Sequence, residues 1–439
     1  MIVATRRALR ALAPFVLLAA VGCVQVSSVT PSDSCSGEQV VIAGSGFGAT
    51  QGTSAITFGA ATAISIASWS DTSISVAVPA GLSGVVNVVV RVGPSASTPL
   101  PFRVIDCPLT GSLGAPRLAI GPGGQPHIAI SQSGALVYLT KTGGAWSTPE
   151  NVDALAGSYD IAATADGRPH VVYEQNSGNG LYLPGMWRYR DPAGWSAAVV
   201  ACAEGSIGTS CPGIRLVAPT DTTLAVLDRN GDRYGNTWVS QRGFDGTSWG
   251  GASQVDYAPI GSYIQDYDAA AGFGSWHATL HRNTFDWGTF QTTYGVKHVL
   301  PGSTSTLASL LGSDPYTTPS AAASLGRMHF VWREGANLVH RWRDMTTGAY
   351  SAPLTIATVT GSPRPVVAAD ANGDDGAFAL WVESGKLMGS VFDASSASWG
   401  APVLVASNAV STPVAAARKG VIHLAWKGSA DDLRYTTLP

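Results

Sequence analysis

From about residue 115 onward, the hydrophobic and polar positions of this chain repeat one pattern seven times. Each copy has a Pro- or Ala-rich strand, a turn with Gly, a second strand that usually opens on His, and a more polar strand. A repeat of this length made only of strands predicts a β-propeller, one four-stranded blade per copy. The first strands fall in Ala115–Ala119, Tyr159–Ala162, Gly213–Leu216, Tyr267–Ala270, Pro319–Ala322, Pro365–Ala368 and Pro413–Ala416.

The residue that opens the second strand aligns the copies. Successive positions are 43, 53, 54, 52, 49 and 45 residues apart, about one blade each. They are His127, His170, Thr223, His277, His329, Phe378 and His423. Most copies close on an aromatic residue, Ser or Gly, and then Ala or Pro, but the seventh has no such close. We therefore expect residues 106–114 to supply the outer strand of the seventh blade and close the ring.

Composition supports an all-β chain. Only 13% of the 439 residues are charged, against about 25% in typical proteins, while Gly (51) and Pro (26) are plentiful, as many short strands and tight turns require. The net charge of −3 argues against nucleic acid as a partner, because no excess of Lys and Arg is present to neutralise phosphates.

The first 23 residues have the pattern of an export signal. Arg6, Arg7 and Arg10 precede a short apolar run, and the segment ends Leu-Ala-Ala-Val-Gly-Cys at Cys23. This ending resembles a bacterial lipobox, and the resemblance implies that Cys23 is lipidated and becomes the first residue of the mature protein. An ordinary secretory signal is the alternative. With Val24 after the Cys, the resemblance favours a lipid anchor in the outer membrane or at the cell surface.

Four further cysteines suit an oxidising compartment, where disulfides persist. They allow three pairings. Cys202 and Cys211 lie close together between the second and third copies and are expected to staple that loop, which leaves Cys35 with Cys107. A metal site is the competing interpretation, but no two of these residues form a CxxC pair.

Residues 26–105 have a different pattern, with alternating positions at Val40, Ile42, Ile74 and Val76 and a turn at Gly44–Gly48 that needs positive φ. The segment closely resembles the IPT/TIG immunoglobulin-like family. The resemblance implies a β-sandwich in which Cys35 and Cys107 meet at one pole. The predicted architecture is therefore a signal peptide (1–23), this sandwich (26–105) and a seven-bladed propeller (106–439).

Two features of the repeats suggest metals. Five His at one repeat position could form a ring of ligands, but equivalent positions diverge around a propeller, so we expect each imidazole to bond a backbone group instead. The segment with Asp228, Asn230 and Asp232 places oxygen atoms at alternate positions, as calcium loops do, and we expect it to follow the second strand of its blade. It lacks the Glu that such loops carry at position twelve. No cofactor is expected, and calcium at this segment stays an alternative to a plain turn.

Residues Phe244-Asp245-Gly246-Thr247-Ser248-Trp249 resemble the Asp-box turn of sialidase-like, BNR-type propellers, where such boxes are structural. A sialidase would also need three Arg, a Tyr nucleophile with an acidic partner, and an Asp acid/base on one face. The candidates for the Arg set are Arg117, Arg215 and either Arg282 or Arg333. No motif places them together, so a glycosidase or lyase is only an alternative.

The residues that open the first strands predict a charged half of the channel mouth. They are Arg117, Asp160, Arg215 and Asp268 in the first four copies and uncharged residues in the other three. Arg282 and Trp287 are expected on the same rim, with Trp287 as a stacking platform. In the alternative interpretation, neighbouring Arg and Asp merely pair and join the blades.

Together these features predict an exported lipoprotein that binds a glycan or protein at the propeller rim, or acts as a scaffold, at the cell surface. The alternatives are a propeller carbohydrate-active enzyme and a purely structural envelope component.

The lipobox resemblance generates a test of anchoring. Replacing Cys23 with Ser removes the only thiol that the lipobox could lipidate, so the variant should move from the membrane to the soluble fraction on cell fractionation. Its melting temperature should match that of the unchanged protein, since Cys23 belongs to no predicted strand. A variant that stays with the membranes would contradict the anchor.

Overall fold

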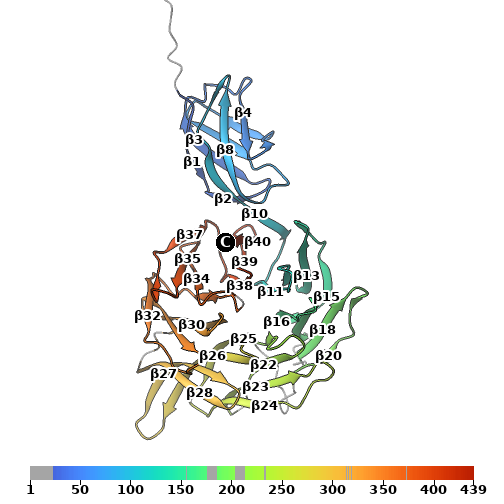
Figure 1. Cartoon of the computed structure of the whole chain (residues 1–439), viewed down its shortest axis with the longest axis vertical. Helices are drawn as coiled ribbons and strands as arrows, with labels where there is room; N and C mark the ends of the chain where they lie inside the picture. Colours follow the sequence, from blue (N-terminus) through green and yellow to red (C-terminus); the bar gives the residue numbers. More distant parts are fainter. Residues whose placement is uncertain are drawn as a thin grey trace, which may run out of the picture. The chain divides into compact units, whose positions relative to one another are not determined.

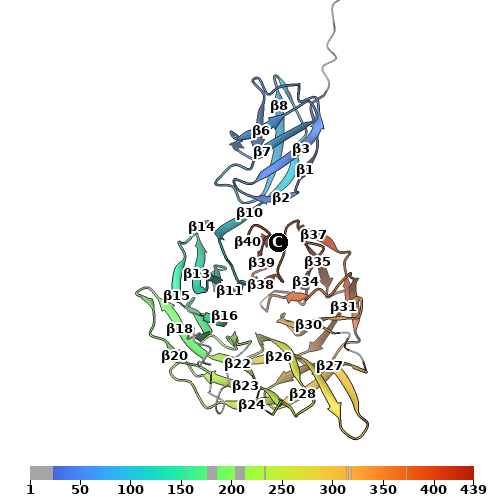
Figure 2. The same ribbon diagram turned by 180° about the vertical axis from the view of Figure 1, so that it is seen from behind.

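The computed structural model describes residues 23–154, 156–175, 185–202, 213–231, 234–312, 314, 316–317, 319–371 and 373–439. Their regular structure consists of β-strands (Figures 1 and 2). The described residues contain no helix that could cross a lipid bilayer. The predicted all-β class is confirmed, and the chain divides into two compact units between Val104 and Ile105. Cys23 is exposed and carries a free thiol.

The first unit is a sandwich of two antiparallel sheets. One sheet has the order β1 (Gln25–Thr30), β3 (Gln39–Ser45), β7 (Ser73–Ala77) and β6 (Ile66–Trp69). The other has the order β10 (Leu100–Thr110), β8 (Gly84–Val92), β4 (Ala55–Phe58) and β5 (Ala61–Thr62), with β2 (Asp33–Cys35) beside β10 and β9 (Ser95–Ala96) beside β8.

Alternation along the strands builds the core of this sandwich. Val40 and Ile42 are fully buried, while Val41 between them is 42% exposed, because successive side chains point to opposite faces of a sheet. Glycine is needed at the end of β3 and in the turn after it. Within β3, a Cβ on Gly44 would lie 1.9 Å from the carbonyl oxygen of Gln25 on β1, so no other residue fits there. In the turn, Gly46 and Gly48 have the expected positive φ, and Phe47 between them is fully buried in the core.

In the second unit, each sequence copy forms its own antiparallel sheet, with the strand at the channel first (Figure 1). The sheets of copies one to three are β11 (Arg117–Ile120), β12 (Pro126–Gln132), β13 (Ala135–Thr142) and β15 (Glu150–Asp153); β16 (Ala156–Ala163), β17 (Pro169–Gln175), β18 (Gly185–Asp191) and β20 (Val199–Val200); β21 (Arg215–Val217), β22 (Leu224–Gly231), β23 (Thr237–Phe244) and β24 (Ser253–Ala258).

The sheets of copies four to six are β25 (Ile264–Gly272), β26 (Ser275–Asp286), β27 (Gln291–Leu300) and β28 (Ser303–Leu311); β29 (Ser320–Ala323), β30 (Arg327–Glu334), β31 (Asn337–Asp344) and β32 (Leu354–Thr358); β33 (Val366–Ala368), β34 (Ala377–Glu383), β35 (Lys386–Asp393) and β37 (Val403–Ala406). Two-residue strands pair with third strands in three sheets: β14 (Ala145–Trp146), β19 (Gly194–Trp195) and β36 (Ser398–Trp399).

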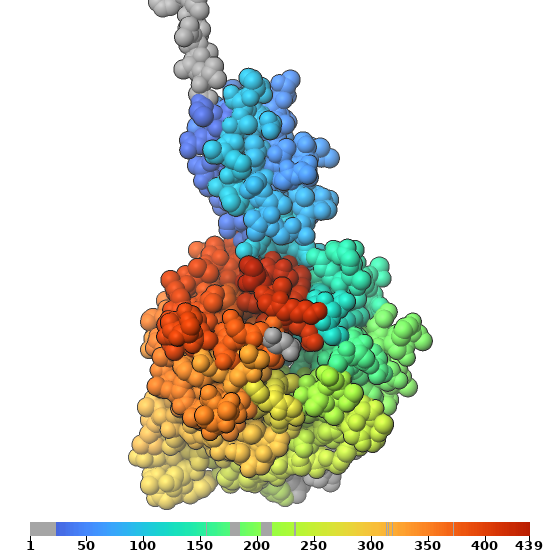
Figure 3. Space-filling view, in the orientation of Figure 1, coloured from blue at the N-terminus to red at the C-terminus, as the bar shows by residue number. Residues whose placement is uncertain are grey.

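The seventh sheet joins the two ends of the repeat region. It contains β38 (Val414–Arg418), β39 (Val421–Lys427) and β40 (Asp432–Leu438), and β10 supplies its outer strand through the pair Asp106 and Tyr435. The Asp106 carboxylate also accepts a hydrogen bond from Trp146 Nε1 of the first sheet at 3.1 Å. Figure 3 shows the last segments, in red, beside the first, in cyan. The predicted closing strand is confirmed.

The repeated His residues are buried, but their main partners are not backbone groups as expected. His127 and His423 each lie 2.6 Å from a Tyr hydroxyl on the third strand of the same sheet. His277 and His329 lie 3.0 Å from a second His on that strand. The partners are Tyr138, Tyr435, His298 and His340. These four imidazoles therefore lie between the second and third strands of their own sheets, where each has a partner other than a metal ion.

The Asp-box segment is a structural turn. Asp245 Oδ1 accepts hydrogen bonds from the backbone N–H of Thr247 and Ser248, both at 2.8 Å. Asp344 and Asp393 form equivalent contacts in the fifth and sixth sheets. These bonds, all made to the ionised carboxylate, hold the pKa of Asp245 down at about 2. The carboxylates cap the hairpins between the third strand and the short segment after it.

Three of the four cysteines that we expected to pair lie in the described residues. Cys35, Cys107 and Cys202 are disulfide-bonded, so the oxidised state that we expected is confirmed for them. Cys211, the expected partner of Cys202, lies outside the described residues. Cys202 is buried, and its sulfur accepts a hydrogen bond from the backbone N–H of Gly185 at 2.9 Å.

The buried His residues predict that acid destabilises the protein. Burial lowers the pKa of His127, His170, His277 and His423 to about 4 and that of His329 to about 3, against 6.5 in the unfolded chain. The unfolded state therefore binds protons first, so the stability is fully present above pH 6.5 and falls as the pH drops towards 4. The melting temperature should be lower at pH 5 than at pH 7.5, and an equal or higher value at pH 5 would contradict this account.

Candidate functional site

Two cavities follow the first strands of the propeller end to end. The larger, of about 650 Å³, is lined by residues in or just before the first strands of all seven sheets. We call it the mouth cavity. The smaller, of about 290 Å³, is lined mainly by Ala, with Asp370 and Arg418 near its end. Ala269, Ala321, Val367 and Ala415 line both. Small side chains at the ends of the strands leave the channel open, while the larger groups gather at the mouth.

The predicted charged half is present at the mouth cavity. Its lining includes Arg117, Asp160, Arg215 and Asp268 from the first four sheets. Sheets five to seven present Ser320, Val366 and Val414 at the equivalent positions. Apart from Arg364 beside the sixth sheet, the cavity therefore has one charged side and one side of small apolar and hydroxyl groups. Asp160 and Asp268 do not open their strands as expected, because β16 and β25 begin four residues earlier.

Each charged residue of this half also bonds a neighbouring sheet. Arg117 Nε donates to the Tyr159 carbonyl at 3.2 Å, and Asp160 Oδ2 accepts the Leu216 N–H at 3.0 Å. Arg215 pairs with Asp268 at 3.3 Å. These contacts support the alternative interpretation, in which the charged residues join neighbouring blades. They leave some polar atoms unused. Within the described residues, the two terminal nitrogens of Arg117 make no hydrogen bond.

The pKa values show how strongly these charges depend on one another. Burial raises the pKa of Asp160, although Arg117 and Arg215 act in the opposite direction. Burial and the neighbouring Arg215 lower the pKa of Arg117. Burial alone would lower the pKa of Arg215, but Asp268 and Asp160 together raise it above its ordinary value. We call Arg117, Asp160, Arg215 and Asp268 the half-ring. Its charges are coupled, and the acidic neighbours of each Arg favour its charged form.

Sequence reasoning missed one residue of the cavity. Arg364, whose side chain is 56% exposed, lines the cavity and pairs with Asp266 of β25 at 3.1 Å. It stands directly before Pro365, which opens the sixth copy. From the sequence, we compared only the residues that open the copies. Comparing the residue before each opening residue as well would have identified Arg364.

Two of the predicted site residues, Arg282 and Trp287, are not among the described residues that line the mouth cavity. Arg282 is 9% exposed, and its guanidinium bonds both oxygens of Asp256 at 2.7 and 2.8 Å. Trp287 is 58% exposed on the hairpin between β26 and β27. Arg333, also considered for an Arg set, bonds the Gly335 carbonyl at 2.6 Å.

We expected the suggested calcium segment to follow the second strand of its blade, and this expectation is wrong. Asp228 and Asn230 lie within β22 and pair in register with Ser240 and Trp238 of β23. Both side chains are buried, and the Asn230 amide donates to the Asp228 carboxylate. Burial raises the pKa of Asp228 to about 6. Asp232 lies outside the described residues, so the two described residues support a buried hydrogen-bonded pair.

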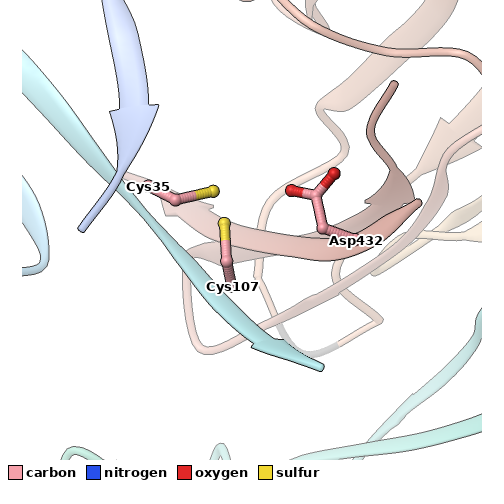
Figure 4. Close-up of side chains that lie close together, drawn as sticks. All are labelled: Cys35, Cys107 and Asp432. Carbon is pink, nitrogen blue, oxygen red and sulfur yellow. The ribbon is translucent and has the colours of Figure 1, made fainter. Parts of the chain in front are cut away.

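Among the described residues, Cys35, Cys107 and Asp432 are the one group whose possible ligand atoms lie within 4.8 Å of one another (Figure 4). A disulfide sulfur is not the thiolate that binds zinc or copper. Because both Cys are disulfide-bonded, the group offers a single carboxylate. Asp432 itself pairs with Arg434 at 2.7 Å. This cluster is therefore a structural one.

Residues 25–104 match the IPT/TIG domain family, which confirms the expected resemblance of the first unit. No curated protein matches the chain. Among solved structures, it is similar to an auxiliary nutrient binding protein from Bacteroides thetaiotaomicron, at 11% identity and a TM-score of 0.34 over 94% of this chain and 98% of that one.

Two further similar structures are enzymes. One is a variant of NanB sialidase from Streptococcus pneumoniae, at 9% identity and a TM-score of 0.40 over 84% of this chain and 75% of that one. The other is the polysaccharide lyase Uly1, at 9% identity and a TM-score of 0.46 over 71% of this chain and 87% of that one. Similarity at this level carries no argument about function.

The contacts of the half-ring predict the cost of removing them. Arg215→Ala leaves the carbonyls of Gly213, Ile214 and Tyr267 without their guanidinium donor. It should lower the free energy of unfolding by about 2 kcal/mol or more. Asp268→Ala should cost less, about 1 kcal/mol, because Arg215 keeps its three backbone acceptors and the neighbouring Asp160.

Chemical denaturation of the two single variants and the double variant measures both effects and their coupling. Arg418→Ala, at the other end of the channel, is the matched control and should change stability by about 0.5 kcal/mol or less. Equal effects of Arg215→Ala and Arg418→Ala would show that the half-ring does not join the sheets.

Proposed function

We propose that the protein is an exported, lipid-anchored binding protein whose propeller takes up a neutral glycan at the mouth cavity. The observation that carries this proposal is the cavity itself, with its charged half and its volume of about 650 Å³. Sites for small organic ligands have volumes of about 300–1,000 Å³ and a few convergent polar groups. Anchoring through Cys23 would hold such a site at the cell surface.

The charge of the cavity favours a neutral, hydroxyl-rich ligand. Three Arg and two Asp line it, and Arg364 is paired with Asp266 outside the lining. The charges nearly cancel, so neither a strong anion nor a strong cation is favoured. A sugar hydroxyl both donates and accepts hydrogen bonds. Alternating guanidinium and carboxylate groups therefore match a run of hydroxyls better than they match a ligand with one charge.

Binding is preferred to catalysis because of the groups that line the cavity. The lining contains no His, Cys, Glu or Tyr among the described residues. The nearest Tyr hydroxyls of the half-ring, on Tyr159 and Tyr267, donate to backbone carbonyls at 2.6 and 2.7 Å. Burial raises the pKa of both. A Tyr nucleophile of the sialidase kind needs the opposite shift, so the proposal assigns the cavity no reaction.

The test is retention of neutral glycans on an array by the purified full chain, followed by calorimetry with the glycans retained. Arg117→Met removes the terminal nitrogens that make no bond to protein, so it should lower affinity about tenfold or more. Arg418→Met at the far end is the matched control and should bind as the unchanged protein does. Failure to retain any neutral glycan, or equal affinity of the two variants, would overturn the proposal.

A further inference from the structure

A second exposed surface lies on the fourth sheet, outside the mouth cavity. Ile260 (53% exposed) and Tyr263 (45%) come from the loop between β24 and β25, and Trp287 (58%) and Phe290 (75%) come from the hairpin between β26 and β27. We call these four residues the aromatic patch. Single exposed apolar residues are ordinary, but a contiguous group of this kind marks an interaction surface.

The patch is held in place by direct contacts. The half-buried Phe285 packs edge-on against Trp287, with ring centroids 4.7 Å apart, and against Phe290 at 6.4 Å. Trp287 Nε1 lies 3.4 Å from the Ile260 carbonyl. A Cβ on Gly261 would lie 3.2 Å from both Phe285 and Trp287, so the loop packs closely under the indole. The patch is thus pre-organised, which reduces the entropy lost on binding.

Hydrogen bonds fix the loop that carries half of the patch. Asn236 Oδ1, from the segment between β22 and β23, accepts the Ile260 N–H at 2.8 Å. Ser262 Oγ accepts the Phe285 N–H at 2.8 Å, and the Tyr263 carbonyl accepts the Asn283 N–H at 2.9 Å. The last two bonds tie the β24–β25 loop to β26, the strand that leads into the hairpin of Trp287 and Phe290. These bonds restrict the movement of the rings relative to one another.

The patch connects to the mouth cavity along one strand. Tyr263 directly precedes β25, and Asp268 of β25 lines the cavity. Five residues of strand at about 3.3 Å each place the two sites about 16 Å apart. Gln265 between them is exposed, and Asp266 pairs with Arg364. Polar groups therefore line the route from the aromatic rings to the charged half of the cavity.

We infer that the aromatic patch is an outer subsite for an extended neutral oligosaccharide whose end occupies the mouth cavity. This inference rests on the proposed function, and it adds that the bound glycan is an oligosaccharide long enough to reach both sites. The C–H face of a sugar ring packs on the electron-rich face of an aromatic ring. Residues 259–263 and 286–291 contain no Lys or Arg and one acidic residue, Asp286. The patch therefore offers no cations to an anionic polymer such as nucleic acid.

The hairpin allows a sharp test, because Phe290 has a φ of +54°. A bulky residue is strained in this conformation, and Gly is not. Phe290→Gly should therefore remove the ring and leave the melting temperature equal or higher. Phe273, on the β25–β26 hairpin, has the same φ of +54° and is 43% exposed, so Phe273→Gly is the matched control.

The measurement compares the affinities of the full chain for disaccharides and octasaccharides of neutral glucans, mannans and galactans. The unchanged protein should bind the octasaccharide of its preferred series more tightly. Phe290→Gly and Trp287→Ala should each weaken octasaccharide binding about tenfold and leave disaccharide binding unchanged. Phe273→Gly should change neither, and Arg117→Met should weaken both.

Each other outcome decides against one proposal. Equal affinity for the two lengths, or octasaccharide binding that the patch variants leave intact, overturns the outer subsite but not the glycan site at the mouth. If Arg117→Met changes neither length while the patch variants weaken both, the mouth cavity is not the binding site. If the patch variants lose only the capture of a protein from the cell envelope, the patch is a protein-docking surface and the inference is wrong.

Discussion

The pairing of β10 with β40 is the constraint on which the propeller depends. A ring of sheets has no free edge only if its first and last segments are joined. Here the outer strand of the seventh sheet comes from β10, which precedes the first copy in the sequence. Asp106 of β10 also bonds Trp146 of the first sheet. Leu113 and Asp431, 318 residues apart, are also hydrogen-bonded. Without this join, the first strands would not converge on one channel.

The mouth cavity combines two roles in the same side chains. Arg117, Asp160 and Arg215 each bond the neighbouring sheet through one part of the group, so they stabilise the ring. They also line the cavity, so the remaining polar atoms are available to a ligand. Ligand affinity and stability are therefore coupled at this site. Arg117, with its two unbonded terminal nitrogens, is the residue at which they separate best.

Position within a repeat made much of this structure predictable. The order of the sheets, the closing strand and the four charged residues of the mouth all follow from the register of the copies. Features that depend on the pairing of second and third strands were not predictable, such as the Tyr138 and His298 partners of the repeated His. The register of the copies also predicts at which end of its blade a residue lies. It does not predict how far that residue lies from the channel axis. For this reason Trp287 was grouped with residues that it does not join.

The sequence also did not predict how far β22 extends. The Asp and Asn residues at 228 and 230 favour turns, but cross-strand pairing with β23 carries the strand through both of them. Local preference lost to tertiary pairing there, as it often does in sheets. Gly44 is fixed in the same way by its neighbour in space, since the carbonyl of Gln25 on β1 leaves no room for a side chain.

The placement of β10 also sets the order in which the chain can fold. Its first half pairs with β8, which is complete as soon as the first unit has been synthesised. Its second half, from Asp106 to Thr110, must wait for β40, which lies far later in the chain. During that interval it is an unpaired edge, the kind of surface that recruits other chains. Until β40 pairs with it, this segment is therefore open to pairing with another chain.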